Sequence, residues 1–256
     1  MNESAQTQLK DEELHLYSRH ILLNEWDIDA QQNLKNSHVL IIGAGGLGCT
    51  SSEMLVRAGV GKITIIDFDK IELSNIQRQI AFDPYQIGQL KVVVLTYHLK
   101  SINPLVKVTA IRDKFDLELA SQLSDHFDLV LDGCDNFATR YAVNQFCVAR
   151  NIPLLTAAAI GLEGQLMMLK SAPCYHCVFP QSSHENPDER RCANSGVLTT
   201  TPAVMASLQA HHALLYLGLD KSPILNKLLL WDGINMQQRL VKVSADPSCP
   251  VCQSSG

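Results

Sequence analysis

The chain has 256 residues, of which 46% are hydrophobic and 18% charged, and its formal net charge is -5. This length allows one or two domains with a sizeable core, and the composition excludes disordered, collagenous and coiled-coil proteins. The negative balance excludes an overall positive field that would attract nucleic acid or anionic lipid, so any bound anion must be held by local groups.

The chain begins MNESAQTQLKDEEL, which is too polar and acidic for a secretory signal peptide. No apolar run approaches the roughly 18 residues that cross a bilayer. We therefore expect a cytoplasmic protein that binds neither membrane nor nucleic acid. In that compartment the eight cysteines are expected to be metal ligands, reactive thiols or small core residues rather than a disulfide framework.

Residues 1–36 are predicted to form an N-terminal helical arm. Apolar residues at helical spacing within 11–36 predict two short helices. Asp27 or Asp29 is a candidate N-cap for the second of them.

From residue 38 onward, short β-branched runs alternate with helix-length segments. The predicted strands are 38–43, 62–67, 106–111, 127–132 and 153–158, and the predicted helices between them are 46–59, 89–101, 116–123 and 136–150. This alternation predicts right-handed βαβ units and a Rossmann-like, doubly wound, mainly parallel sheet of the α/β class.

After residue 160 the pattern changes. The segment GQLMMLK comes first, followed by a predicted helix over 200–218 and predicted strands near 225–231 and 238–243, which extend the same sheet as C-terminal antiparallel strands. The polar stretch 181–195 is interpreted as a lid or a surface excursion. We expect residues 37–256 to form a single domain with halves 37–160 and 161–256.

A glycine motif, GAGGLG, separates the first predicted strand from its helix. Its glycines are Gly43, Gly45, Gly46 and Gly48. Glycine permits the sharp turn and lets phosphate approach the backbone, while the N–H groups of the helix N-terminus point at the anion. Asp67, at the end of the next strand, is placed to accept hydrogen bonds from a ribose hydroxyl. The alternative is a tight turn that binds no ligand.

The glycine motif alone does not distinguish NAD from ATP. Arg78 in SNIQR and Lys91 in GQLK follow it. A nicotinamide needs a flat apolar slot, whereas a triphosphate is neutralised by the forked guanidinium of Arg78 and the point charge of Lys91. These cations favour ATP, and an NAD-dependent oxidoreductase is the alternative from another enzyme class.

The sequence DGCDN follows the fourth predicted strand. Carboxyl ends of strands are where open α/β sheets bind ligands, and Asp135 there is placed to hold a Mg²⁺ ion that also contacts phosphate oxygens. Helix N-capping is the alternative role for an Asp or Asn at this point. Both roles can hold for the adjacent residues Asp135 and Asn136.

Two CxxC pairs lie far apart in the chain, Cys174 with Cys177 and Cys249 with Cys252. Together they can form a closed tetrahedral four-sulfur Zn²⁺ site that clamps the C-terminus onto the domain. Redox chemistry at a single pair is the alternative.

The remaining cysteines fall into two groups. Cys49, Cys134 and Cys147 are expected to be small packed residues. Cys192 follows two arginines in the polar stretch, whose charges would lower the pKa of its thiol.

The motifs GAGGLG, DFD, SNIQRQ, GQLK and DGCDN, in this order and at these separations, resemble the ubiquitin-activating-enzyme-like adenylyltransferases that act on small sulfur-carrier proteins in the molybdopterin and thiamine pathways. The resemblance runs from YSRHILL to the last cysteine pair. It implies a homodimer that uses ATP and Mg²⁺ to convert the C-terminal glycine of a ubiquitin-like carrier, with a Gly-Gly tail, into an acyl-adenylate and pyrophosphate. We prefer the molybdopterin carrier, with the thiamine carrier as the alternative.

The resemblance also implies roles for individual residues. Asp67 would hold the ribose, Asn75, Arg78 and Lys91 would contact the phosphates, and Asp135 would serve the metal. The nucleotide-binding set is completed by Asp69, Ser74, Gln77 and Asn136. The C-terminal carboxylate of the carrier, with a pKa of about 3.5, is already ionised at neutral pH and needs no general base to attack the α-phosphate of ATP. The absence of a recognisable catalytic triad is therefore expected.

Two further residues carry implied roles. Arg19 in YSRHI would reach into the nucleotide site of the neighbouring subunit, and its alternative is an exposed arginine on an amphipathic helix. Cys192 would lie in a loop over the adenylate and take up the carrier or sulfur, and its alternative is an incidental exposed thiol.

By the same resemblance, 37–160 is the nucleotide-binding half of an adenylation domain and 161–256 the carrier-binding half with the zinc site. A sulfurtransferase or cysteine desulfurase is a further expected partner. A third reading is a non-catalytic, zinc-clamped module that docks a ubiquitin-like protein without activating it.

Overall fold

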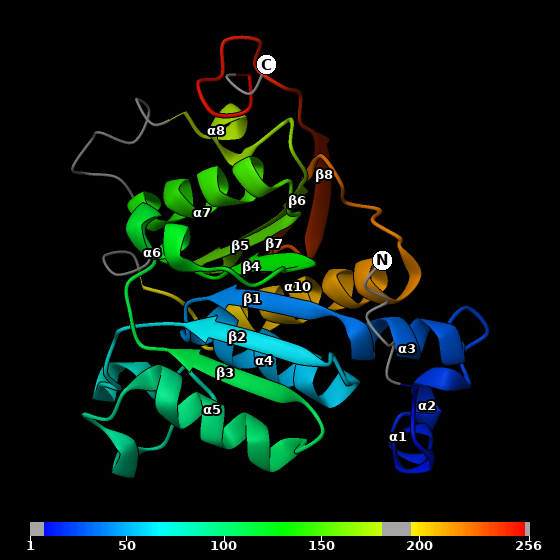
Figure 1. Ribbon diagram of the computed structural model, residues 1–256. Helices are drawn as coiled ribbons and strands as arrows, with labels where there is room; N and C mark the ends of the chain where they lie inside the picture. Colours follow the sequence, from blue (N-terminus) through cyan, green and yellow to red (C-terminus); the bar gives the residue numbers. More distant parts are fainter. Residues whose placement is uncertain (1–7, 181–195, 254–256) are drawn as a thin grey trace.

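The computed structural model describes residues 8–180 and 196–253, and its centre is one eight-stranded sheet (Figure 1). In spatial order the strands are β3 (Lys107–Ile111), β2 (Lys62–Ile66), β1 (His38–Ile42), β4 (Leu129–Asp132), β5 (Leu154–Ile160), β6 (Glu163–Leu169), β7 (Lys227–Asp232) and β8 (Gln237–Lys242). Neighbours from β3 to β5 pair in parallel, and β6, β7 and β8 add antiparallel pairs. The predicted doubly wound sheet with an antiparallel extension is therefore confirmed.

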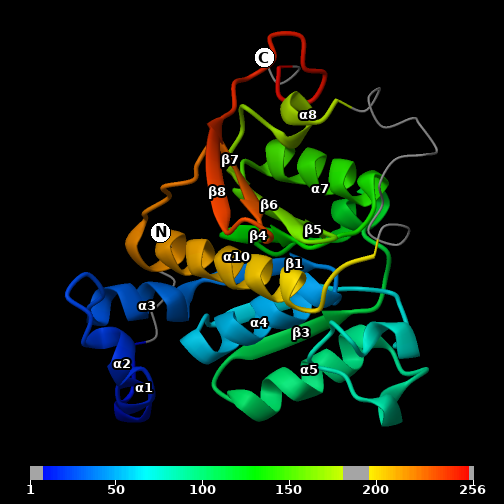
Figure 2. The ribbon, with the colours of Figure 1, turned by 180° about the vertical axis from the view of Figure 1, so that it is seen from behind.

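Helices cover both faces of this sheet, because the central strands are apolar on both sides. The longer helices are α4 (Gly46–Ala58), α5 (Lys91–Ile102), α7 (Phe137–Arg150) and α10 (Thr200–Leu219), and the short ones are α6 (Leu117–Gln122), α8 (Tyr175–Val178) and the 3₁₀ turns η1 (Leu73–Asn75) and η2 (Pro84–Gln86). In Figure 1 α7 lies in front of the sheet, and α10 lies in front of it in the opposite view of Figure 2. Val39 and Ile41 point into the core beneath α4, α5 and α10, whereas Leu40 and Ile42 point into the core beneath α6 and α7. The all-buried pattern of β1 is typical of a parallel strand between two helical layers.

The N-terminal arm contains three helices, α1 (Asp11–Leu16), α2 (Ser18–Ile21) and α3 (Ile28–Asn36), so the expectation of two was wrong. Tyr17 separates α1 from α2, because its backbone, at φ -95° and ψ 12°, departs from helical geometry. Its ring is 4% exposed, and its hydroxyl accepts a hydrogen bond from Asn103. Asp27 is the cap of α3, since its carboxylate accepts a bond from the N–H of Ala30 at 2.9 Å.

The strand order reverses between β1 and β4, where the chain leaves the sheet in opposite directions toward β2 and β5. At this switch point the loops after the two strands meet. Gly43 has φ +97°, and a Cβ atom there would lie 3.2 Å from the carbonyl oxygen of Gly133. Open α/β sheets bind ligands in the crevice at such a point.

None of the helices in the described residues is both long enough and apolar enough to cross a bilayer.

Candidate active site

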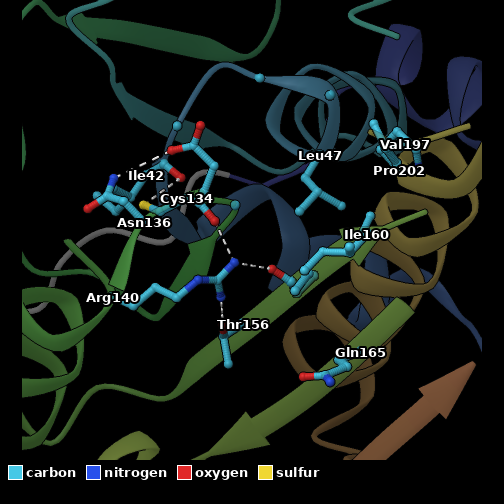
Figure 3. A pocket seen from close by; sticks show the side chains of 18 of the residues that line it. Ile42, Leu47, Cys134, Asn136, Arg140, Thr156, Ile160, Gln165, Val197 and Pro202 are labelled. Carbon is cyan, nitrogen blue, oxygen red and sulfur yellow. Dashed lines mark hydrogen bonds between the residues drawn. The ribbon is translucent and has the colours of Figure 1, made fainter. Parts of the chain in front are cut away.

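A cleft of about 1320 Å³ opens at the carboxyl ends of the central strands and continues along β6, β7 and β8. The residues predicted to bind nucleotide that line it are Gly43, Gly45, Gly46, Asp67, Asp69, Ser74, Asn75, Gln77, Arg78, Lys91, Asp135 and Asn136. Figure 3 shows how two walls face each other, with Leu47 of α4 on one side and Ile160 and Gln165 of β5 and β6 on the other. Residues from five separate sequence motifs therefore share one cavity.

The glycine loop forms the floor of the cleft because two backbone segments approach closely there. A Cβ atom on Gly48 would lie 1.8 Å from the carbonyl oxygen of Gly43, so only glycine lets α4 begin against the loop. Gly45 caps α4 without a side-chain hydrogen bond to its first N–H groups. These N–H groups and the positive end of the helix dipole suit an anion.

Asp67 is fixed at the end of β2 by two backbone hydrogen bonds. Its Oδ2 accepts from the N–H of Ala44 at 2.7 Å and its Oδ1 from the N–H of Asp69 at 2.8 Å. Burial raises the pKa of the Asp67 carboxyl group above its ordinary value. Each carboxylate oxygen keeps a further lone pair, so both can still accept a hydroxyl group.

The two predicted cations reach the same cleft from different elements. Lys91 is the first residue of α5, and its Nζ lies 2.9 Å from Oδ2 of Asp69. Arg78 follows η1, and its Nη1 donates to the carbonyl oxygen of Ser74 at 2.9 Å. A Cβ atom on Gly46 would lie 3.2 Å from the Arg78 carbonyl oxygen, which shows how near the Arg78 backbone is to the start of α4.

Asn75 and Gln77 line the same part of the cleft as Arg78, and both make contacts through their side-chain amides. Oδ1 of Asn75 accepts from the N–H of Glu72 at 3.1 Å and closes η1. Oε1 of Gln77 accepts from the hydroxyl of Thr199 at 2.9 Å, so the SNIQR motif contacts the residue before α10. Sequence reasoning did not foresee the Gln77 contact, because its partners lie 122 positions apart.

Of the two adjacent residues Asp135 and Asn136, the second takes the helix-capping role considered for this turn. Oδ1 of Asn136 accepts from the N–H of Thr139 at 2.9 Å, so Asn136 is the N-cap of α7. Asp135 is exposed in the cleft, with its Oδ1 at 3.5 Å from the Asn136 amide nitrogen. A carboxylate in this position is able to coordinate a divalent ion beside a phosphate group.

Sequence reasoning missed Arg140, which lies behind the cleft and is 7% exposed. Its guanidinium donates to the hydroxyl of Thr156 and to the carbonyl oxygens of Cys134 and Ala157 (Figure 3). It also donates to the carboxylate of Asp132. These acceptors come from the end of β4, from the middle of β5 and from the loop before Asp135. An Asp that ends a strand, followed by an Arg within the next helix, was the weak signal available in the sequence.

The four paired cysteines come together at one place. The Sγ atoms of Cys174 and Cys249 lie 3.6 Å apart and those of Cys177 and Cys252 3.5 Å apart. All four lie within 4.8 Å of one another. A tetrahedral zinc ion with Zn–S bonds of about 2.3 Å requires sulfur atoms roughly 3.8 Å apart, so the donor set fits zinc.

The other described cysteines are buried thiols. Burial raises the pKa of Cys49 to about 12, and it raises the pKa values of Cys134 and Cys147 well above the ordinary range. A thiol with a raised pKa is a poor nucleophile at neutral pH, so these residues are packed groups as expected. Cys192 lies outside the described residues.

The sequence matches the ThiF family over residues 17–251, which is most of the chain. The chain belongs to the ThiF family.

Two curated relatives of this ThiF-family chain come from Escherichia coli strain K12. Molybdopterin-synthase adenylyltransferase is 39% identical over 249 residues, covering 96% of this chain and 98% of the relative. Sulfur carrier protein ThiS adenylyltransferase is also 39% identical, over 250 residues, with the same coverage of 96% and 98%. Among solved structures, E. coli MccB with ATP is similar with a TM-score of 0.77 and 25% identity, covering 88% of this chain and 69% of MccB.

In this ThiF-family chain Arg19 does not belong with the other predicted site residues. It is exposed on α2 and is not among the described residues that line the cleft. Figure 1 shows α1 and α2 beyond the end where β1 begins, whereas the glycine loop follows the end of β1. Arg19 therefore lies away from the cleft of its own chain.

Proposed function

We propose that this protein adenylylates the C-terminal glycine of a small ubiquitin-like sulfur-carrier protein. The observation that carries the proposal is the joined cleft, in which the glycine loop, Arg78 and Lys91 share one cavity with the antiparallel strands. One end of such a cavity suits a triphosphate and the other suits an extended peptide. The names of the two E. coli relatives support the same reaction.

In this reaction the nucleotide lies along the glycine loop. Asp67 accepts hydrogen bonds from the ribose hydroxyls, and the first N–H groups of α4 face the phosphates. Arg78 and Lys91 neutralise the triphosphate, with Asn75, Ser74 and Gln77 forming the neighbouring wall. ATP binding needs local cations because the chain as a whole carries a net charge of -5.

A Mg²⁺ ion is the cofactor expected beside the phosphates, with Asp135 as its protein ligand. When bound, the ion would offset charge on the phosphate oxygens and the pyrophosphate. The exposed carboxylate of Asp135, not consumed by helix capping, supports this role.

The chemical step needs alignment rather than a base. A carboxylate oxygen of the carrier glycine, ionised at neutral pH, bonds to the α-phosphorus of ATP. The bond from that phosphorus to the bridging oxygen breaks, and pyrophosphate leaves with its electron pair. Arg78 and Lys91 stabilise the charge that moves onto the pyrophosphate.

We assign carrier binding to the half 161–256. The wall of the cleft there is formed by Gln165 and Leu166 of β6, Trp231 of β7 and Arg239 of β8. These side chains line an open path from the sheet extension to the glycine loop. An extended Gly-Gly tail has no side chains to obstruct such a path.

We assign the four-cysteine cluster to a structural zinc ion. Its sulfurs come from the segment after β6 and from the end of the chain, so the ion would close a link between them. Four thiolates leave no open coordination position for catalysis. A sulfur donor such as a sulfurtransferase or cysteine desulfurase would act after adenylylation.

We further propose a homodimer in which Arg19 serves the cleft of the neighbouring subunit. α10 contains no Asp, Glu, Lys or Arg over its twenty residues, and Leu208, Leu214 and Tyr216 on it are only partly buried. A helix that is apolar all round is normally covered on every side. A second copy of the chain would cover α10. It would also bring Arg19 to the cleft of the neighbouring subunit, since Arg19 does not reach the cleft of its own chain.

The decisive experiment is carrier-dependent exchange of labelled pyrophosphate into ATP. The molybdopterin and thiamine carriers are purified and compared side by side, because the relatives named for the two pathways are equally identical to this chain. We expect exchange with at least one carrier and its loss in Arg78→Ala. The matched control is Arg57→Ala, an exposed arginine of α4 outside the cleft.

Other outcomes contradict the proposal. Exchange with neither carrier, while a carrier still binds, would favour the docking module. A rise in melting temperature with NADH but not with ATP would favour the oxidoreductase. Shared sites are tested by mixing Arg19→Ala with Lys91→Met, since a mixed dimer would contain one complete site and recover activity.

A further inference from the structure

The cysteine cluster has a neighbour on α7 whose side chain uses both ends of its amide. Asn144 is 1% exposed. Its Nδ2 donates to Sγ of Cys174 at 3.5 Å, and its Oδ1 accepts from the backbone N–H of Tyr175 at 2.8 Å. One side chain therefore holds both a cluster sulfur and the first peptide group of α8.

The need for such a donor follows from charge. Four thiolates around one Zn²⁺ carry a formal charge of about -2, and removing that charge from water is costly unless N–H groups offset it. Cys174 and Cys249 are each 1% exposed, so water cannot solvate their sulfurs. The N–H of Asp246 lies 3.4 Å from Sγ of Cys177, and Nδ1 of His176 lies 3.9 Å from Sγ of Cys249.

Asn144 differs from these two neighbours because it lies on a long helix of the domain rather than beside a cluster cysteine in the chain. It also continues a stripe on α7, since Asn136, Arg140 and Asn144 follow one another at intervals of four. Residues at this interval share one face of a helix. The stripe runs from the cap at the cleft, through the buried guanidinium, to the sulfur of Cys174.

We propose that Asn144 is a positioning residue of the metal cluster, whose amide N–H donates to the Cys174 thiolate and raises the affinity of the four sulfurs for zinc. The inference rests on the zinc site proposed above. Partners of metal ligands fix the orientation of the ligand and tune its donor strength, and their loss commonly lowers metal affinity about 10- to 100-fold. The bond from Tyr175 to Oδ1 fixes which end of the amide faces the sulfur.

The test replaces the amide donor and keeps the acceptor. Asn144→Asp retains an oxygen for the Tyr175 N–H but presents a carboxylate to the sulfur. We expect its zinc affinity, measured by competition with a chromogenic chelator, to fall about 10- to 100-fold. In cobalt-substituted protein the thiolate-to-cobalt charge-transfer band should move to longer wavelength, because a thiolate without its hydrogen bond gives up electrons more easily.

The matched control is Gln145→Glu, which makes the same chemical change at the next, exposed position of α7. It should leave both the zinc affinity and the cobalt spectrum at their wild-type values. Asn144→Ser, which adds no charge, is the second variant and tests the proposal where Asn144→Asp fails to fold. The melting temperature of each variant is measured with and without zinc, because only the zinc-bound form should lose the extra stability.

Wild-type zinc affinity and an unshifted cobalt band in a folded Asn144 variant would overturn the proposal. An equal loss of melting temperature with and without zinc, at unchanged affinity, would assign Asn144 a packing role only and would also overturn it. A wild-type protein that binds no zinc would overturn it too. None of these readouts depends on pyrophosphate exchange, so the proposed reaction and this inference can fail separately.

Discussion

Arg140 and Asp132 form a buried ion pair, with 2.8 Å between Nη1 of the guanidinium and Oδ2 of the carboxylate. Asp132 ends β4, and its other oxygen accepts from the N–H of Cys134 at 2.9 Å. The hydroxyl of Thr156 on β5 donates to the same carboxylate at 2.6 Å. The pair therefore joins two strands and the loop that leads to Asp135, so the shape of the cleft depends on it.

Removing one partner of this pair should be costly. Arg140→Met would leave the Asp132 carboxylate buried and uncompensated, and we expect a loss of about 3 to 5 kcal/mol in the free energy of unfolding, measured with urea. The double variant Arg140→Met with Asp132→Asn should lose less than the sum of the single changes. Strictly additive losses would contradict a direct coupling between the two side chains.

The position of Lys91 in the cleft, with its Nζ beside Asp69, predicts a contribution to nucleotide affinity. Lys91→Met should weaken binding of a non-hydrolysable ATP analogue about 10- to 100-fold in calorimetry, because a hydrogen bond to a charged group contributes about 1.5 to 3 kcal/mol. Lys62→Met is the control, since Lys62 begins β2 at the opposite end of the sheet and pairs with Asp125. Equal affinities for both variants would remove Lys91 from the site.

Substitutions at Gly48 and Gly88 should differ in their cost to stability, because only the first of these two glycines lies against another backbone segment. A Cβ atom on Gly48 would lie 1.8 Å from the Gly43 carbonyl oxygen, whereas one on Gly88 would meet nothing within 4 Å. Gly88→Ala should cost about 1 kcal/mol for its positive φ. Gly48→Ala should cost about 3 kcal/mol or more in urea unfolding and should also lower ATP affinity. A Gly48 variant as stable as the Gly88 variant would disprove the close approach.

His38 predicts a pH dependence of stability. Burial, reinforced by the charge of Lys62, lowers the pKa of His38 to about 4, from 6.5. The folded state keeps the ring neutral, while the unfolded chain binds a proton below about pH 6.5, so this stability is complete above that pH and is lost toward pH 4. From pH 7 to pH 5 the loss should be about 2 kcal/mol for this residue.

The measurement is the urea unfolding free energy at several pH values. His38→Gln should flatten the dependence between pH 7 and pH 5. The control His126→Gln replaces a histidine whose side chain is 85% exposed and should leave the slope unchanged. Identical slopes for wild type and His38→Gln would mean that His38 does not titrate with folding.

The sequence was sufficient for the order of most strands and helices and for twelve of the residues that line the cleft. Strand and helix periodicity, the glycine turn and the Asn136 cap depend on residues close together in the chain, so a linear pattern contains them. The two CxxC pairs likewise named the four sulfurs before their distances were known. The arm was one exception, because the burial of Tyr17 against Asn103 depends on a contact across 86 positions.

Only the tertiary structure decided which polar groups meet. Arg140 with Thr156, Gln77 with Thr199 and Asn144 with Cys174 each join residues that are far apart in the chain. Such contacts depend on how the helices pack against the sheet and on the conformations of the loops, and the local periodicity of the sequence does not encode them. Short motifs therefore identify the chemistry of this chain, whereas the geometry that supports those motifs arises from burial, which favours a hydrogen-bond partner for most enclosed polar groups.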